Sequence, residues 1–154
     1  MSRRDQIRMT SDEVVAFLSE QKTVTVATNG RDGWPHLMPL WYVLRGGAAL
    51  WGWTYASSQK VRNLERDPRC TLQVEAGTEY AELRGVMLKA EVVVHRDVED
   101  VWSVGAELAQ RYGGADLTPE VEAAMRKQAA KRVGLEFVVS ETASWDHRKL
   151  AGTY

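Results

Sequence analysis

The sequence predicts a mostly-β protein, a β-barrel with flanking helices, that occupies residues 1–154 as a single domain. Several short runs alternate apolar and polar residues and are rich in β-branched and aromatic side chains, as half-buried strands are. Glycine-containing turns at residues 30–33 and 45–47 join the first three runs as a meander. Few helices separate the runs, which favours an antiparallel barrel over parallel βαβ units. The chain is also long enough to bury a hydrophobic core.

The first expected element is a helix over residues 11–20. Thr10 and Glu13 have the spacing of a capping box, and the apolar residues that follow fall on one face of the helix. The expected strands then cover residues 23–29, 34–44, 48–54, 69–75, 80–95 and 132–144.

A helical insert is expected near residues 97–131, in two pieces. Asp97 or Asp100 caps the first piece, which ends at the glycines of residues 113–114. The dipeptide Thr118-Pro119 opens the second piece as an N-cap and a first-turn proline.

Composition and charge argue against several classes of function. The formal charge of −1 and a pI near 6.3 give no basic footprint for nucleic acid. No stretch reaches the ~18 apolar residues of a membrane span, and the N-terminus lacks the apolar core of a signal peptide, so a cytoplasmic protein without a membrane partner is expected. Cys70 is the only cysteine and is expected to be a small buried hydrophobe. The three histidines, His36, His95 and His147, lack metal-site spacing, so no metal is expected.

The most informative segment is the polar stretch at residues 57–68, which lies between two expected strands. It predicts a helix whose N-terminal N–H groups and dipole suit an anion. Ser57 and Ser58 add hydroxyl donors, and Lys60 adds a positive charge. The segment therefore predicts a phosphate-holding loop. The alternative is an ordinary helix in which Ser57 or Ser58 is the N-cap while Lys60 and Arg62 are solvated.

Motifs around this loop match one family in order and spacing. They are residues 23–28 (TVTVAT), 30–36 (GRDGWPH), 37–42 (LMPLWY), 60–64 (KVRNL) and 67–69 (DPR). Through them the chain resembles the pyridoxamine-phosphate-oxidase-like split β-barrel superfamily, with a second stretch of likeness at residues 134–149. It resembles most closely the branch that binds the deazaflavin coenzyme F420.

The resemblance implies a homodimer of FMN-binding-like split barrels, with the cofactor in a groove between the protomers. The implied cofactor is coenzyme F420, and FMN is the alternative. The implied activity is that of a reductase that transfers a hydride between the deazaflavin and an unidentified conjugated small molecule. An FMN-binding oxidoreductase and a non-catalytic carrier of flavin or a haem-like tetrapyrrole are the alternatives. No residue stands out as a catalytic acid. The implied cofactor-binding residues are Pro39, Leu40, Trp41, Trp53, Thr54, Ser57, Ser58, Gln59, Lys60, Asn63 and Trp145.

Two positions of the loop depart from the family pattern. FMN-binding members usually carry an Arg-Lys pair, whereas Gln59 precedes Lys60 here. The deazaflavin branch often has an arginine where this chain has Ser58. The loop thus offers fewer cations for a phosphate than the family usually supplies.

Tryptophans are dense in the first half of the chain, where Trp34, Trp41, Trp51 and Trp53 occur within twenty positions. Trp51 and Trp53 share one strand face, so with Trp41 they are expected to form an apolar wall beside a planar ring. Packing in the core or at a dimer interface is the alternative. The family often places an aromatic of the C-terminal tail near the cofactor, across the dimer interface, which implicates Trp145. The alternative for Trp145 is a frayed tail.

Overall fold

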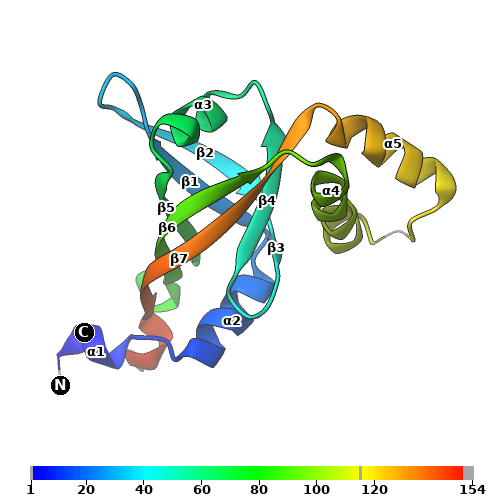
Figure 1. Cartoon of the computed structure of the whole chain (residues 1–154). Coiled ribbons are helices and arrows are strands. Elements are labelled where there is room, and N and C mark those ends of the chain that lie inside the picture. Colours follow the sequence, from blue (N-terminus) through cyan, green and yellow to red (C-terminus); the bar gives the residue numbers. More distant parts are fainter. Residues whose placement is uncertain (1, 115, 151–154) are drawn as a thin grey trace.

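The computed structural model describes residues 2–114 and 116–150. Seven strands form one antiparallel sheet in the order β2-β1-β5-β6-β7-β4-β3 (Figure 1). The strands are β1 (Thr23–Asn29), β2 (Pro35–Trp41), β3 (Val43–Leu44), β4 (Leu50–Tyr55), β5 (Arg69–Ala76), β6 (Arg84–His95) and β7 (Arg132–Asp146).

The sheet curls until its two edges meet. Strands β2 and β3 stand at opposite edges of the hydrogen-bonded order, yet only Tyr42 separates them in the chain. Gly52 allows the close approach of β4 to β2, because a Cβ at this position would lie 2.8 Å from Leu40 Cδ2 and 3.2 Å from the Trp41 carbonyl oxygen. The predicted mostly-β barrel with flanking helices is confirmed, as a curled sheet typical of a split barrel.

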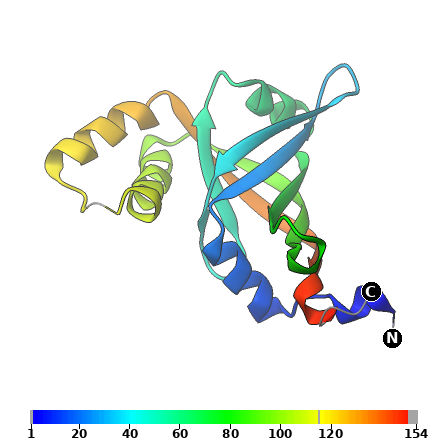
Figure 2. The same ribbon diagram turned by 180° about the vertical axis from the view of Figure 1, so that it is seen from behind.

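Helices lie at both ends of the sheet and along one side (Figures 1 and 2). Helix α3 lies at one end beside β1, while α1, α2 and the C-terminal 3₁₀ turn η2 lie at the other end. The pair α4 and α5 forms the predicted insert and packs α4 against β3, β4 and β7. The helices are α1 (Arg3–Gln6), α2 (Ser11–Glu20), α3 (Gln59–Arg66), α4 (Val98–Gly113) and α5 (Pro119–Ala129), and the 3₁₀ turns are η1 (Tyr80–Glu82) and η2 (His147–Leu150).

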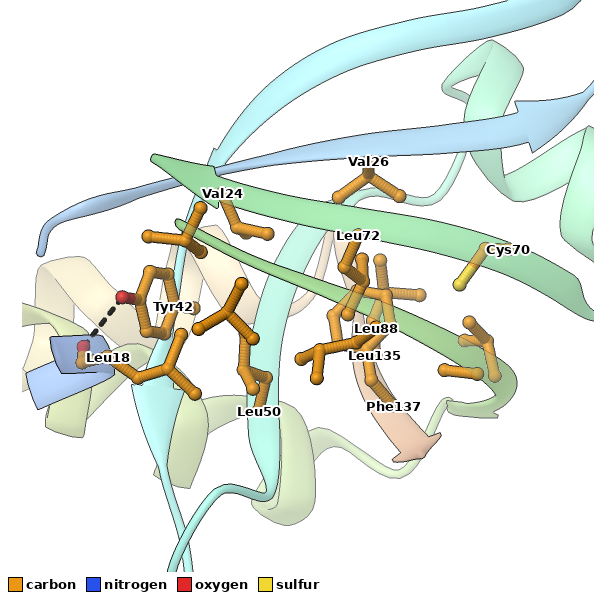
Figure 3. Packing of buried hydrophobic residues seen from close by; sticks show 14 of the residues in the cluster. Leu18, Val24, Val26, Tyr42, Leu50, Cys70, Leu72, Leu88, Leu135 and Phe137 are labelled. Atoms are coloured by element: carbon orange, nitrogen blue, oxygen red, sulfur yellow. Dashed lines mark hydrogen bonds between the residues drawn. The ribbon is translucent and has the colours of Figure 1, made fainter. Parts of the chain in front are cut away.

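The core fills the inside of the curl with alternate residues of the strands (Figure 3). Tyr42 lies fully buried among them, and its hydroxyl donates to the Leu18 carbonyl at 2.6 Å. Burial raises the pKa of Tyr42 to about 12. Cys70 is buried as predicted, and burial also raises the pKa of its thiol to about 12.

Most local expectations are confirmed. Helix α2 has the predicted bounds, and its capping box is formed: the Glu13 N–H donates to Thr10 Oγ1 at 3.3 Å and the Thr10 N–H donates to Glu13 Oε2 at 2.7 Å. Asp97 caps α4, Gly114 ends it in the left-handed conformation, and Thr118 caps α5. These signals are local in the chain, which is why they could be identified from sequence.

Two predicted strands are wrong in part. The run at residues 34–44 is broken at Tyr42, because the Tyr42 N–H donates to the Tyr112 hydroxyl at 3.0 Å and its carbonyl accepts from Tyr112 and Arg111 instead of from a strand. The strand expected from residue 80 begins at Arg84, the partner of Ala76 at the end of β5. Residues 80–82 lie beyond that pair and form the turn η1.

Two features at the chain ends were not expected. Helix α1 forms at Arg3–Gln6, and Ser2 caps it by accepting from the Asp5 N–H at 3.2 Å. Strand β7 continues to Asp146, past the expected end at residue 144. No helix in the two described ranges is both long and apolar enough to span a bilayer.

Candidate functional site at the N-terminus of helix α3

The predicted phosphate loop joins the end of β4 to helix α3. The Ser58 N–H donates to the Tyr55 carbonyl at 3.0 Å, and the Ala56 N–H donates to the Lys131 carbonyl at 3.0 Å, which fixes the turn against the start of β7. Ser58 is the N-cap residue by backbone conformation, but its side chain makes no capping hydrogen bond. Its Oγ is buried and lacks a hydrogen-bond partner in the described part of the chain. The Ser58 hydroxyl thus lies at the N-terminus of α3 but accepts no hydrogen bond from the N–H groups of the helix.

Lys60 is the main charge of the site. Its side chain is only 7 % exposed, and its Nζ donates to Thr54 Oγ1 at 3.0 Å. No carboxylate among the described residues lies within ion-pair distance of it. Burial lowers the pKa of the ammonium group, because desolvation disfavours the charged form. The alternative expectation of a solvated Lys60 is therefore wrong, whereas Arg62 is exposed as that alternative expected.

A buried cation without a counterion is unfavourable by itself. A phosphate would supply the missing charge, and Lys60, the free N–H groups of α3 and the unpartnered Ser58 hydroxyl are the donors that this segment offers. Helix α3 has no acidic residue in its first turn to compete for these donors. The residues present therefore fit an anionic group such as the phosphate of a flavin or deazaflavin.

Gln59 and Asn63 anchor the helix. Gln59 Nε2 donates to Asn63 Oδ1 at 2.9 Å, and Asn63 Nδ2 donates to Thr28 Oγ1 of β1 at 3.0 Å. Asn63 is fully buried. Asn63 thus holds α3 against β1 and fixes the position of the N-terminus of α3.

A hollow of about 450 Å³ lies beside this helix, between α3 and the turn that joins β1 to β2. His36 lines it with a buried Nδ1 that has no hydrogen-bond partner within the described ranges, and Arg31 and Trp34 lie at its wall. His36 and Arg31 were not among the predicted site residues. The sequence signal for them was weak, because only the tertiary packing brings this turn beside α3.

The predicted residues of β2 divide between its two faces. Pro39 and Trp41 are exposed, and the Trp41 ring stacks on Tyr112 of α4 with 4.4 Å between ring centroids. Leu40 turns inward and packs against the core. The outer face of β2 also carries Leu37, which is 57 % exposed.

Trp53 faces helix α4. A Cβ on Gly105 would lie 2.5 Å from Trp53 Cζ3, so the missing side chain of Gly105 allows the indole to lie against the helix. Trp51, on the same strand face, stacks on His95 with 4.9 Å between centroids. Much of the aromatic wall predicted from this strand therefore packs against the chain's own α4 and β6, which is the packing alternative. A contact between Trp53 and a cofactor stays a prediction.

Arg132 is a second cation near the loop that the sequence reasoning missed. It pairs with Tyr55 across β4 and β7, and its guanidinium lies 4.0 Å from the Tyr55 ring centroid and 4.6 Å from that of Trp53. Its Nε is buried without a partner in the part of the chain that is described. No signal in the sequence identified it, because the pairing of residues 55 and 132 is long-range.

Trp145 lies far from the loop within one protomer. It is near the end of β7, whereas the loop packs against the beginning of that strand, at the opposite end of the sheet (Figure 1). A role at the cofactor would have to come from a second copy, and it stays a prediction. The tail up to Leu150 is folded as η2, and residues 151–154 lie outside the described residues.

Comparison with known proteins identifies the family. The family model described as pyridoxamine 5'-phosphate oxidase matches residues 10–146. The chain belongs to this family. The pyridoxamine 5'-phosphate oxidase family match covers the sheet, α3 and the helical insert, so it includes the whole loop at α3. No curated protein gives a significant match.

Several solved structures share the fold. The conserved hypothetical protein Rv2991 from Mycobacterium tuberculosis is 38 % identical, with a TM-score of 0.91 over 100 % of this chain and 95 % of that one. A protein named F420 reductase is 20 % identical, with a TM-score of 0.64 over 82 % of this chain and 93 % of that one. HutZ, the heme storage protein from Vibrio cholerae, is 18 % identical, with a TM-score of 0.65 over 84 % of this chain and 89 % of that one. The last two likenesses show the fold alone.

Proposed function

We propose that this protein binds the phosphate of coenzyme F420 at the N-terminus of α3 and acts as an F420-dependent reductase of a conjugated small molecule. The observation that carries the proposal is the buried Lys60 without a counterion, beside the unpartnered Ser58 hydroxyl. Membership of the pyridoxamine 5'-phosphate oxidase family supports a flavin-type ligand at this loop. The fold shared with a protein named F420 reductase is compatible with the deazaflavin.

The chain's own residues would hold and orient the cofactor. Lys60 neutralises the phosphate charge, and the Ser58 hydroxyl and the first N–H groups of α3 donate hydrogen bonds to phosphate oxygens. Asn63 and Gln59 keep the helix in register on β1 through the bond to Thr28. When bound, the deazaflavin supplies two-electron hydride chemistry, and the protein supplies binding, orientation and exclusion of water.

The partner in this proposal is a second copy of the chain. The outer face of β2 exposes Leu37 and Trp41, each 57 % exposed. Large apolar side chains exposed on one strand face are compatible with an interaction site. Light scattering at micromolar concentration tests this part: a dimer is expected, and a monomer would remove the shared-groove model.

Direct binding measurements test the cofactor. The purified protein is titrated in parallel with F420 and with FMN, by calorimetry or by quenching of cofactor fluorescence. The proposal expects saturable binding of F420, tighter than that of FMN, and binding weakened between about tenfold and a hundredfold in Lys60→Ala. Tighter binding of FMN would favour the FMN-binding oxidoreductase.

Turnover separates an enzyme from a carrier. Reduced F420 is mixed with a panel of enones and quinones, and its reoxidation is followed by absorbance. Saturable F420 binding with no reoxidation by any acceptor would favour a carrier. A haem-type absorption band in the purified protein, with no F420 binding, would overturn the proposal.

A further inference from the structure

A flat aromatic pair lies at the end of β2 that is far from α3. Trp41, the last residue of β2, stacks on Tyr112 of α4 with 4.4 Å between the ring centroids and 9° between the ring planes. Trp41 is nevertheless 57 % exposed, so the face of the indole that Tyr112 does not cover is open in the single chain. Leu37 and Pro39 are exposed on the same face of the strand. The outer face of β2 therefore ends in an open aromatic surface.

Tyr112 is fixed in place before any ligand binds. The Tyr42 N–H donates to the Tyr112 hydroxyl at 3.0 Å, and this hydroxyl can donate to the Lys22 carbonyl at 2.6 Å or to the Tyr42 carbonyl at 2.9 Å. These bonds join α4 to the residue that follows Trp41 and to the residue that precedes β1. The Lys22 ammonium group also lies 5.1 Å from the centroid of the Tyr112 ring. The Tyr112 ring thus has a set position against which the indole of Trp41 is held.

Holding an exposed tryptophan in one position affects ligand binding. A side chain on a strand surface loses rotamer freedom when a ligand contacts it, and this loss of entropy weakens binding. The stack with Tyr112 restricts the Trp41 indole already in the free protein. A planar ligand that contacts the open face of Trp41 therefore meets a surface that is already ordered. In this way Tyr112 can increase the affinity for a ligand that it does not touch.

The distance from the phosphate loop to Trp41 fits one extended molecule. His36, near the start of β2, lines the hollow beside α3, and Trp41 ends the strand. The five residue steps between them span roughly 17 Å at about 3.3 Å a residue. Flavin and deazaflavin nucleotides carry their phosphate and their planar ring system at opposite ends of a sugar-alcohol chain, which gives them a comparable length. A molecule that lies along β2 can therefore reach both α3 and Trp41.

We propose that Tyr112 is a positioning residue for the ring of the cofactor, because it holds the Trp41 indole flat against the place where the deazaflavin ring lies. The inference rests on the proposed function, since it concerns the ring of the same F420 molecule whose phosphate is assigned to Lys60. It adds a role for the helical insert, which reaches the site through the last turn of α4.

Two substitutions of Tyr112 separate positioning from support of the fold. Tyr112→Phe removes the hydroxyl bonds and keeps the stacked ring, so it should lower the Tm and leave the Kd for F420 within about twofold of the parent value. Tyr112→Leu removes both the bonds and the ring. It should have a Tm similar to that of Tyr112→Phe but bind F420 about three- to tenfold more weakly. Equal affinities of the two variants for F420 would overturn the proposal, whether or not they match the parent.

Substitution of Trp41 tests whether Tyr112 acts through it. Trp41→Leu, at an exposed position, should weaken F420 about fivefold or more. Adding Tyr112→Leu to Trp41→Leu should then weaken F420 by less than about a further twofold. A further loss as large as in the parent protein would mean that Tyr112 acts elsewhere and would overturn the proposal. If Tyr112→Leu fails to fold, as judged by circular dichroism, unchanged F420 affinity in Trp41→Leu overturns the proposal by itself.

The fluorescence of bound F420 reports the contact directly. An indole stacked on a fluorescent planar ring quenches its emission by electron transfer. At saturating protein, the emission of F420 should therefore be higher in Trp41→Leu and in Tyr112→Leu than in the parent, and unchanged in Tyr112→Phe. Emission in Trp41→Leu equal to that in the parent would show that the indole does not face the ring, which would overturn the proposal.

A ligand without phosphate distinguishes the ring from the phosphate loop. The deazariboflavin that corresponds to F420 has the same ring and no phosphate. Tyr112→Leu should weaken F420 and the deazariboflavin by the same factor, whereas Lys60→Ala should weaken F420 alone. A loss confined to F420 in Tyr112→Leu would overturn this inference. Unchanged F420 binding in Lys60→Ala would overturn the proposed function, whereas weakened binding in Lys60→Ala with equal affinities of the two Tyr112 variants would overturn only the inference about Tyr112.

Discussion

Replacing Lys60 by methionine should move stability and phosphate binding in opposite directions. Methionine keeps the length of the aliphatic stem and removes the ammonium group. Lys60 as a whole is 7 % exposed, and among the described residues its ammonium group donates only to Thr54 Oγ1. In the protein without ligand the charge is desolvated and uncompensated, so its removal should stabilise the fold. In the proposed complex the same charge would be the main partner of the phosphate, so its removal should weaken binding.

The two effects have different sizes. A charge-assisted hydrogen bond contributes about 1.5–3 kcal/mol, so Lys60→Met should weaken F420 binding between about tenfold and a hundredfold. Removing a buried charge while losing one hydrogen bond should raise the free energy of unfolding by about 1 kcal/mol. For a domain of this size that corresponds to a rise of about 2–4 °C in Tm.

The stability gain should depend on pH. Burial lowers the pKa of Lys60 in the folded protein below its ordinary value of 10.5. Below the folded pKa the ammonium is charged in both states, and the folded state carries the whole cost of desolvation. As the pH rises through the folded pKa towards 10.5, the folded state releases its proton first and this cost falls. The gain from Lys60→Met should therefore be largest near neutral pH and shrink as the pH rises towards 10.

Urea unfolding at several pH values and F420 titration measure the two effects. Arg62→Met is the matched control, since Arg62 is exposed on the same helix and should change neither quantity appreciably. A fall of 1 kcal/mol or more in the stability of the ligand-free Lys60→Met protein, with unchanged F420 affinity, would refute this reasoning. Lys60 would then be an ordinary structural residue.

Three further outcomes follow from single contacts. Gly105→Ala should lower the free energy of unfolding by about 1–3 kcal/mol, because the new Cβ would lie 2.5 Å from Trp53. Gly113→Ala, at the open end of the same helix, should raise the free energy of unfolding by about 0.5–1 kcal/mol. Chemical denaturation measures both changes. Cys70 should react with a thiol reagent at pH 8 far more slowly in the native protein than in urea, because burial raises its pKa to about 12; similar rates would contradict its burial. Tyr42→Phe should lower the free energy of unfolding by about 1–2 kcal/mol by removing its buried hydroxyl bond, and no loss would mean that Arg111 alone satisfies those carbonyls.

Short-range features of this chain were predictable because their causes lie within a few residues. The capping box at Thr10 and Glu13 and the left-handed end of α4 at Gly114 depend on spacing and on residue type alone. The prediction of a phosphate-holding loop at residues 57–68 was made in the same way, from serines and one lysine at the start of a helix, and phosphate binding there stays a prediction. Its backbone placement at the start of α3 agrees with that expectation.

Contacts between residues far apart in the chain determined the features that the sequence did not predict. The break at Tyr42 arises from hydrogen bonds to Arg111 and Tyr112, about 70 residues later in the chain. Trp53 packs on α4, and Arg132 reaches the loop by pairing with Tyr55. No periodicity within a strand encodes which distant helix or strand will cover its outer face.

The sequence by itself determined the class of fold, the helix ends and the position of the polar turn before α3, because alternation, capping and turn chemistry act between neighbours in the chain. Only the tertiary structure decided that Lys60 is buried without a counterion, that α4 covers the outer face of β4, and that Trp145 lies at the far end of β7 from the loop. Burial and the absence of a partner depend on which surfaces meet when the sheet curls, and the curl brings together residues that are far apart in the sequence.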